Sequence, residues 1–311
     1  PPPHRPRGRP HARGRARLRQ NHRVRADVCR NDRVIINRSF VTPRRARLRR
    51  AHRDDAKDAM SGIGSGYDLS TTTYPPDGRV FQVEYASKAV DNGGLTIGVA
   101  CADGVVIGCE TLVPSKLHTP NTTRRIGAVA RHAGIGASGY APDARAVRDR
   151  ARAECAQYKS FYGDAIPGKL LADRMAHYYH LFTLYWSVRP FGCASVLAVK
   201  DFDGYHLYTL EPSGECAKMR GACVGKGKSA AKTEVEKFNF SEMKCEEAVR
   251  EVARIIYATH DVKDKDFECE LSWICDASAG EFQRVPDALA EPARAAAAAA
   301  VAGDADAMDA T

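Results

Sequence analysis

Among the residue patterns of this 311-residue sequence that could carry chemistry, the most suggestive is a glycine-rich stretch. Residues 221–229 read GACVGKGKS and resemble a loop whose backbone N–H groups cradle a phosphate. That loop requires a glycine five positions before the glycine of Gly227-Lys228-Ser229, and Ala222 stands there instead. The stretch is therefore predicted to be a glycine turn that leads into a helix.

Side chains for nucleophilic or metal chemistry are present, but none stands at a diagnostic spacing. The sequence contains no G-x-S-x-G and no H-E-x-x-H motif. Its ten cysteines form no C-x-x-C pair, and no two histidines have zinc-finger spacing. His177 and His180 lie three apart on a predicted helix, where surface or packing roles are expected. We therefore expect free thiols in a reducing compartment, no metal site and no cofactor.

Apolar periodicity predicts the elements that must position any site. Strands are expected at 95–101, 105–109, 126–129, 133–137, 193–199, 205–210 and 271–275. Helices are expected at 79–92, 143–160, 168–186, 228–240 and 245–260, with an alanine-rich helix near the end. Because strands and helices come in runs and do not alternate strictly, the predicted class is α/β (α+β), with antiparallel sheets and outer helices.

Basic charge is confined to the first fifth of the chain. The formal charge is +9 at pH 7, but residues 1–53 hold 18 Arg and 2 Asp, which gives +16. Residues 60–311 hold 28 basic and 33 acidic residues and therefore carry −5. A nucleic-acid-binding role would rest on the first segment alone. No apolar run approaches the roughly 20 residues of a membrane span, so an integral membrane protein is not expected.

Residues 1–59 are rich in Arg, Pro, Gly and Ala. We expect them to be disordered, because they have too few apolar residues to offset the entropy of ordering. Such an arm could bind phosphate backbones, serve as an organelle transit peptide or carry a nuclear localisation signal. A fourth explanation is upstream sequence carried into an over-extended gene model, since Met60 lies at the break in composition. We favour this fourth explanation.

A dense motif follows that break. Residues 67–86 read YDLSTTTYPPDGRVFQVEYA. This resembles the signature of proteasome alpha subunits, in which an aromatic residue and a short spacer precede aromatic-Pro-x-Asp-Gly-Arg-x-x-Gln-x-Glu-Tyr-Ala. The residues that fit are Tyr67, Tyr74, Pro75, Asp77, Gly78, Arg79, Gln82, Glu84, Tyr85 and Ala86. Further family landmarks follow in order, so the resemblance covers about residues 61–290.

The resemblance implies a four-layer αββα sandwich of the Ntn-hydrolase type, with two antiparallel sheets between two helix layers. It also implies a role as one of seven alpha subunits in the outer ring of the proteasome core particle. That particle serves ubiquitin-dependent protein degradation in the cytoplasm and nucleus. The implied partners are other alpha subunits, the beta ring, regulatory caps and assembly chaperones, with no membrane and no nucleic acid among them.

A catalytic role is disfavoured at the position where the related beta subunits carry their nucleophile. Those subunits use a threonine at the processed N-terminus, and its free amine acts as the base. Leu95 stands at the matching position here, and Thr96 is predicted to point to the opposite face of the strand. Glu110 and Lys116 lie near the family's supporting acid and lysine, but without a nucleophile we expect them to be structural. An active threonine peptidase and a basic-arm nucleic-acid binder are the alternatives.

The resemblance also assigns two candidate sites. The N-terminal tail is expected to help close the axial pore of the ring, and its gate residues are Tyr67, Asp68, Pro75 and Tyr85. In the family, the C-terminal carboxylate of a regulator enters a pocket between alpha subunits and faces a lysine. The residues assigned to that pocket here are Arg125, Gly139 and Lys116. An arginine keeps the charge and can bind a carboxylate through two parallel hydrogen bonds.

Four segments follow from these observations. A disordered extension is expected at 1–59, a gate tail at 60–78, the proteasome alpha-type domain at 79–290, and the end of an alanine-rich helix with an acidic tail at 291–311.

We expect the native chain to start at or just after Met60. The formal charge changes there from strongly positive to negative, and an Arg-rich arm on each tail would crowd a narrow pore with like charge. Mass spectrometry of tryptic peptides from purified core particles tests this expectation, and peptides from residues 20–50 would contradict it.

Overall fold

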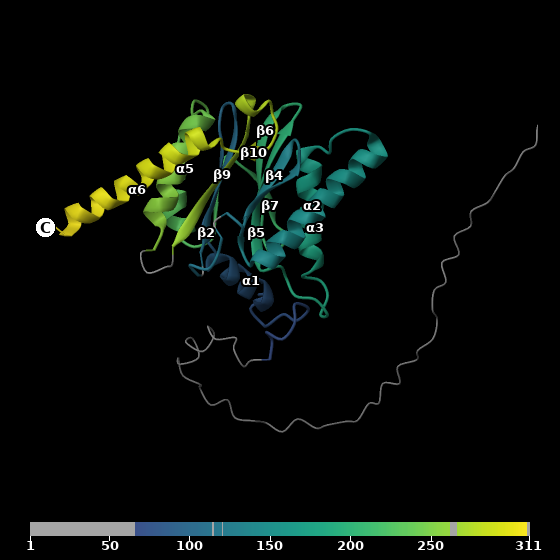
Figure 1. Ribbon diagram of the computed structural model, residues 1–311. Coiled ribbons are helices and arrows are strands. Elements are labelled where there is room, and N and C mark those ends of the chain that lie inside the picture. The colour runs from purple at the N-terminus through teal and green to yellow at the C-terminus, as the bar shows by residue number, and fades with distance from the viewer. Residues whose placement is uncertain (1–65, 114, 120, 262–265, 310–311) are drawn as a thin grey trace, which may run out of the picture. The chain divides into compact units, whose positions relative to one another are not determined.

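The computed structural model describes residues 66–113, 115–119, 121–261 and 266–309. All of them belong to the second of two units into which the chain divides, Asp54–Thr311. The extension predicted for residues 1–59 and the first part of the predicted gate tail lie outside the described residues. Within the described part, two antiparallel sheets lie face to face between two layers of helices (Figure 1). This arrangement confirms the predicted sandwich.

The first sheet has the strand order β10-β9-β2-β1-β8, and each neighbouring pair is antiparallel. Its strands are β1 (Thr96–Ala100), β2 (Gly104–Leu112), β8 (Gly221–Val224), β9 (Phe267–Cys275) and β10 (Gln283–Arg284). β9 begins four residues before the predicted strand, because Phe267 pairs with Leu112 and its ring packs on Tyr257 with centroids 4.9 Å apart.

The second sheet has the strand order β3-β4-β5-β6-β7 and is also antiparallel. Its strands are β3 (Ile126–Ala130), β4 (Ala133–Gly139), β5 (Cys193–Asp201), β6 (Gly204–Leu210) and β7 (Cys216–Met219). β5 is the central strand and is buried over its first seven residues, as its continuous apolar run predicts. The strands that the sequence did not predict are β7, β8 and β10, which have four residues or fewer.

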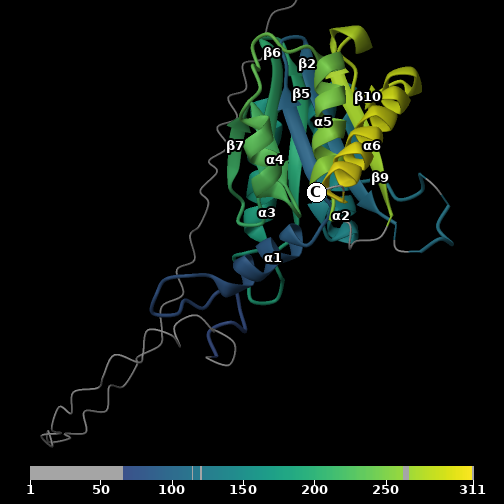
Figure 2. The same ribbon diagram turned by 90° about the vertical axis from the view of Figure 1, so that its left-hand side faces the viewer.

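Helices cover the outer face of each sheet (Figures 1 and 2). The first sheet is covered by α4 (Lys228–Val235), α5 (Cys245–Thr259) and α6 (Asp287–Asp309). The second sheet is covered by α2 (Ala141–Tyr162) and α3 (Gly168–Leu181). The remaining helix, α1 (Phe81–Asp91), lies across one end of the sandwich. Among the described helices, none is long and apolar enough to cross a bilayer.

Two helices end earlier than their apolar periodicity predicts. α3 ends at Leu181 and not at residue 186, and Thr183 Oγ1 then donates a hydrogen bond of 2.7 Å to the carbonyl of His180. α4 ends at Val235 and not at residue 240, because Phe238 and Phe240 leave the helix and pack against the core beneath it. The glycine turn predicted before α4 is confirmed, and the helix begins directly after Gly227.

The acidic end of the chain also differs from the prediction. α6 begins at Asp287 and continues to Asp309, so the helix runs on through most of the segment that we expected to be an acidic tail. Alanine is the best helix former, and the run of alanines explains why the helix extends this far.

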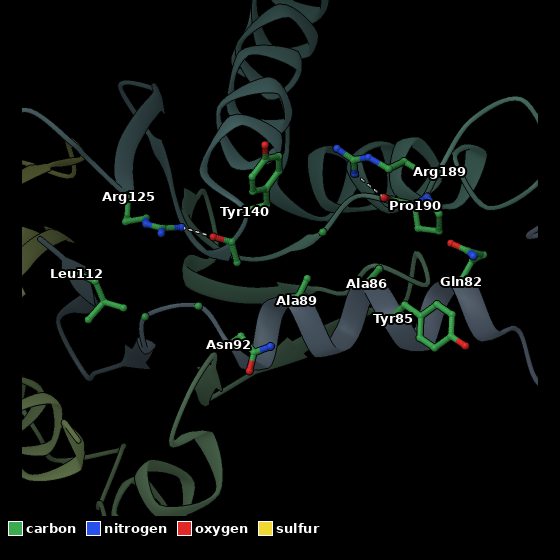
Figure 3. A pocket seen from close by; sticks show the side chains of 14 residues that line it. Gln82, Tyr85, Ala86, Ala89, Asn92, Leu112, Arg125, Tyr140, Arg189 and Pro190 are labelled. Atoms are coloured by element: carbon green, nitrogen blue, oxygen red, sulfur yellow. Dashed lines mark hydrogen bonds between the residues drawn. The ribbon is translucent and has the colours of Figure 1, made fainter. Parts of the chain in front are cut away.

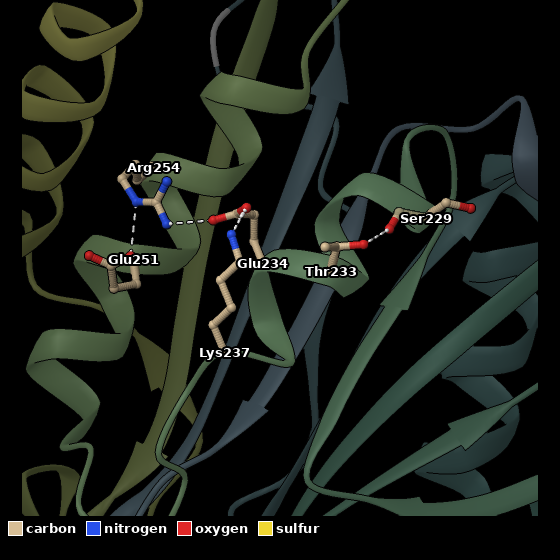
Figure 4. A network of polar contacts seen from close by, with 6 residues as sticks. All are labelled: Ser229, Thr233, Glu234, Lys237, Glu251 and Arg254. Atoms are coloured by element: carbon tan, nitrogen blue, oxygen red, sulfur yellow. Dashed lines mark hydrogen bonds and ion pairs between the residues drawn. The ribbon is translucent and has the colours of Figure 1, made fainter.

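A network of ion pairs ties α4 to α5 (Figure 4). Glu234 of α4 accepts from Arg254 of α5 at 3.3 Å and from Lys237 at 2.5 Å. Arg254 also donates to Glu251 of its own helix at 2.9 Å. Because these side chains are a third to two thirds exposed, each pair contributes only about 0–1 kcal/mol. The network orients α4, whereas the apolar residues beneath it supply most of the stability.

The two sheets meet in an apolar layer that includes Val105, Ile107, Val196 and Leu207. The approach is close, because a Cβ added at Gly98 would lie 2.6 Å from Cγ1 of Val196. Such a layer has no room for a larger side chain and leaves a cavity when a side chain is shortened.

Ile107→Ala should destabilise the protein by about 2–5 kcal/mol, because Ile107 is fully buried between the sheets. For a domain of this size, that loss lowers the thermal unfolding midpoint by roughly 4–20 °C. The matched control is Leu117→Ala, since Leu117 is 94% exposed and its truncation should change stability by less than about 0.5 kcal/mol. Equal midpoints for the two variants at the same protein concentration would contradict the assigned core.

Candidate functional site

Leu95, which stands where related subunits carry their nucleophile, is buried, and its backbone N–H is hydrogen-bonded. Leu95 is 1% exposed, and its peptide N–H donates a hydrogen bond of 3.0 Å to Oε2 of Glu110. The other carboxylate oxygen of Glu110 lies 2.7 Å from Nδ1 of His260. Glu110 therefore acts as a structural link between β1, β2 and the end of α5, as the sequence predicts.

The neighbouring hydroxyl does not replace the missing nucleophile. Thr96 is fully buried, and its Oγ1 lies 2.6 Å from Sγ of Cys109. Burial raises the pKa of the Cys109 thiol to about 12, so this thiol stays protonated near neutral pH. Lys116 lies in the exposed turn between Ser115 and His118. No nucleophile with an adjacent base exists at this position in the described part of the chain.

The segment before α1 folds back onto that helix through Asp68. Gln82 Nε2 donates to the backbone oxygen of Asp68, and Tyr85 Oη donates to Asp68 Oδ2 at 3.4 Å. The structure thus brings together two of the predicted gate residues, Asp68 and Tyr85. Tyr67 directly precedes this contact and is 40% exposed. Pro75 is buried, and its carbonyl accepts from Gly78 N at 2.9 Å to close the turn before α1.

Two further anchors of this segment were not identified from the sequence. Gln82 enters the sequence prediction only as one position of the motif. Thr71 is buried, and its Oγ1 donates to the carbonyl of Tyr185 at 3.3 Å. Tyr185 lies in the loop after α3, 114 residues along the chain, so local sequence holds no signal for this contact.

A cleft of about 750 Å³ lies between α1 and the segments at the ends of β4 and α3 (Figure 3). Ala86 and Ala89 of α1 form one wall, and Tyr140 and Pro190 lie across from them. Arg125 and Gly139 both line this cleft, so the structure brings together these two residues of the predicted pocket. Lys116 is not among the lining residues.

The Arg125 side chain is held at the cleft by the backbone of β4. Its Nη1 donates to the carbonyl oxygen of Gly139, while its Nε is buried without a hydrogen-bond partner among the described residues. Gly139 has a φ of +100°, and a Cβ at this position would lie 2.3 Å from the carbonyl oxygen of Gly192. Only glycine therefore fits this part of the cleft.

An ion pair fixes the opposite wall, and sequence reasoning assigned Arg189 no role at this site. Arg189 donates to both carboxylate oxygens of Asp143, at 2.6 and 2.9 Å, and Gly192 N donates to Asp143 at 2.8 Å. Burial opposes ionisation of Asp143, but the Arg189 guanidinium and the Gly192 N–H outweigh it and hold the pKa of this carboxyl below its ordinary value. The loop after α3 is thereby fastened to the first turn of α2.

Comparison with known proteins agrees with the fold and with the segment before α1. A family model described as proteasome subunit matches residues 90–274, and a second model, described as the N-terminal signature of A-type proteasome subunits, matches residues 67–89. The chain is 56% identical to the alpha type-3 proteasome subunit of Spinacia oleracea over 243 residues, which cover 78% of this chain and 98% of that protein. It is 51% identical to the alpha type-3 proteasome subunit of Dictyostelium discoideum over 237 residues, or 76% of this chain and 96% of that protein.

A third relative is the probable alpha type-7 proteasome subunit of Schizosaccharomyces pombe, which is 47% identical over 237 residues and is covered over 93% of its length. These matches run through both sheets and include the signature that precedes α1. The chain therefore belongs to the proteasome subunit family, among its alpha-type subunits.

Proposed function

We propose that this chain is a non-catalytic subunit of the outer ring of the proteasome core particle, with its N-terminal segment in the axial gate and its cleft open to regulators. The main support for the proposal is that a buried leucine, Leu95, stands where an active subunit would carry its nucleophile. An active subunit of this fold would need a free amine on a nucleophilic residue. Leu95 instead offers an aliphatic side chain and an internal peptide N–H that is bound to Glu110.

The contacts of residues 66–78 suit a gate that opens and closes. The side-chain hydrogen bonds that hold this segment to the rest of the chain include those of Thr71, Gln82 and Tyr85. Each such bond contributes about 1 kcal/mol net, so together they hold the segment by only a few kcal/mol. A regulator that binds the released form more tightly can therefore tip the equilibrium.

The Arg125 cleft suits a terminal carboxylate. Its lining combines the apolar wall of α1 with two guanidinium groups, from Arg125 and Arg189. Arg189 is already paired with Asp143, whereas among the described residues the Arg125 side chain binds only a carbonyl. Arg125 is therefore the proposed carboxylate receptor. The assignment of Lys116 to the carboxylate pocket stays a prediction. Because its turn does not line this cleft, Lys116 could reach a bound carboxylate only if the pocket is completed between two subunits.

Assembly with other proteasome subunits follows from family membership. We propose in addition that regulatory caps and assembly chaperones bind the outer face, and that the subunit works in the cytoplasm and nucleus. The division into an extension at 1–59, a tail at 60–78, a domain at 79–290 and an end segment at 291–311 is part of the same proposal.

A core particle assembled with this subunit starting at Thr73 should hydrolyse a fluorogenic peptide several-fold faster than the native particle, without any regulator. The truncation removes Asp68 and Thr71 and with them the anchors of the segment. Tyr85→Phe, which removes only the 3.4 Å bond to Asp68, should give a smaller increase.

Leu117→Ala serves as the control, because it alters an exposed side chain outside the gate segment. A covalent inhibitor of the beta sites should abolish hydrolysis equally in all particles. Unchanged basal hydrolysis in a fully assembled truncated particle would remove this tail from the gate, and hydrolysis that survives the inhibitor would contradict the non-catalytic assignment.

Arg125→Ala should weaken binding of a regulator's C-terminal peptide to the assembled particle by about 10–100-fold, since a hydrogen bond to a charged group contributes about 1.5–3 kcal/mol. Arg125→Lys should recover part of the affinity, because it restores the charge but not the planar pair of donors. Fluorescence anisotropy measures the affinity, and the same peptide with a C-terminal amide is the control. An amide that binds as tightly as the free acid would show that the carboxylate is not recognised.

A further inference from the structure

Four arginines from two separate parts of the chain surround a small cavity behind the Arg125 cleft. Two of them lie in the segment that enters β3, and two lie on the first turns of α2. The cavity has a volume of about 20 Å³, and its apolar lining includes Ile135 and Ala144. It shares only Arg125 with the cleft. The arginine pocket is defined by Arg124, Arg125, Arg145 and Arg148.

Positive charge in this pocket is not balanced by ion pairs. Among the described residues, none of its four arginines pairs with an acidic side chain, and the acids of α2 nearby are engaged elsewhere. Asp143 binds Arg189, and Asp149 binds Arg152 at 3.2 Å. The carboxylate of Asp149 and, more weakly, the buried carboxylate of Glu270 attract Arg148 from a distance without forming an ion pair with it. Glu270 is held by other groups. Its oxygens accept backbone N–H groups of Arg125 and Ile126 at 3.2 Å each, so they bind no guanidinium of the pocket.

Two donors of the pocket residues are buried and unsatisfied. Nε of Arg125 and Nε of Arg148 have no hydrogen-bond partner among the described residues. Burial, and then the like charges of Arg152 and Arg145, lower the pKa of the Arg148 guanidinium. Buried donors of this kind in native proteins commonly bind an ordered water or an ion. A bound anion would satisfy the donors and relieve the repulsion together.

The Arg148 side chain lies against the backbone of β3. It lies across Gly127 of β3, because a Cβ added there would be 2.7 Å from Cδ and 2.9 Å from Nη1 of Arg148. The absence of a side chain at Gly127 therefore leaves the space that Arg148 occupies beside the cavity.

The size of the cavity limits how much of a ligand can enter. About 20 Å³ is room for roughly one water-sized group, such as one oxygen of a carboxylate. A whole carboxylate and a whole tetrahedral oxyanion are both too large for this volume, so only one oxygen of the ligand enters and the rest of the group stays outside. Arg124 and Arg145 are exposed, so they are available to the second oxygen outside the cavity. Planar guanidinium groups match this flat, two-oxygen geometry.

We propose that the arginine pocket binds a single carboxylate group, either of a free small carboxylate or of an Asp or Glu side chain on a neighbouring subunit. The pocket adjoins the cleft proposed for regulator termini and shares Arg125 with it, but Arg124, Arg145 and Arg148 line the pocket alone. The binding of a free carboxylate does not depend on the ring role.

The test is an acetate titration of the full chain at constant ionic strength, with chloride as the exchanged anion. Raising acetate from 1 to 100 mM should raise the thermal unfolding midpoint by about 2–5 °C, because a ligand that binds only the folded state stabilises it. Arg148→Gln and Arg145→Gln should each reduce this shift to less than about 1 °C. The side chain of Arg145 makes no hydrogen bond to another described residue, so its variant should fold even if that of Arg148 does not.

The matched control is Arg131→Gln, which removes the same charge from the β3–β4 turn, where Arg131 is 86% exposed. This variant should keep the full acetate shift. An equal shift in all variants, or no shift in the native chain, would overturn the proposal.

A second experiment identifies the source of the carboxylate and rests on the proposed ring role. Arg148→Gln and Arg131→Gln subunits are co-expressed with the other alpha subunits, and their incorporation into rings is measured by native mass spectrometry. A several-fold lower incorporation of Arg148→Gln alone assigns the carboxylate to a neighbouring subunit. Equal incorporation, together with a positive acetate titration, assigns it to a free carboxylate.

Discussion

The joint between α1 and β1 is the constraint on which both candidate sites depend. The chain passes from the helix to the strand through Gly93 and Gly94, where other backbone segments approach too closely for any side chain. A Cβ at Gly93 would lie 2.3 Å from Gly139 N, and one at Gly94 would lie 2.2 Å from the carbonyl oxygen of Glu110. Ser138 Oγ donates to the carbonyl of Gly94 at 2.7 Å and fixes the same joint to β4.

This joint sets the direction in which α1 leaves the sandwich. With that direction fixed, one side of the helix forms a wall of the Arg125 cleft. Gln82 and Tyr85 of the same helix donate hydrogen bonds to Asp68 in the segment that precedes it. The same backbone contacts place Leu95 against Glu110. The features that support a gate and a docking cleft, and those that argue against catalysis, therefore share one structural cause.

Apolar periodicity in the sequence predicted most of the elements and the antiparallel sheets with outer helices, because long strands and helices carry a clear apolar period. The four-layer sandwich itself was implied by the family resemblance. β7 and β8 were missed, since four residues are too few to show alternation. The motif around Asp68 and Tyr85 indicated residues that do meet in space. The contact of Thr71 with Tyr185 joins segments far apart in the chain, and the role of Arg189 depends on a loop whose path only the fold determines. Lys116 was grouped with Arg125 from the resemblance alone, which does not say which way an exposed turn projects.

Two arginines of α2 also contact β3, the strand at one edge of the second sheet. β3 is an edge strand, and an uncovered edge offers backbone groups to any passing strand. Arg148 lies across Gly127, and Arg152 Nε donates to the carbonyl of Ala128 at 2.9 Å. Arg148 thus covers part of the face of β3, while Arg152 engages a backbone acceptor of this edge strand. A carbonyl that already accepts from Arg152 is not open to a foreign strand, so pairing at this point of the edge would first have to displace that arginine.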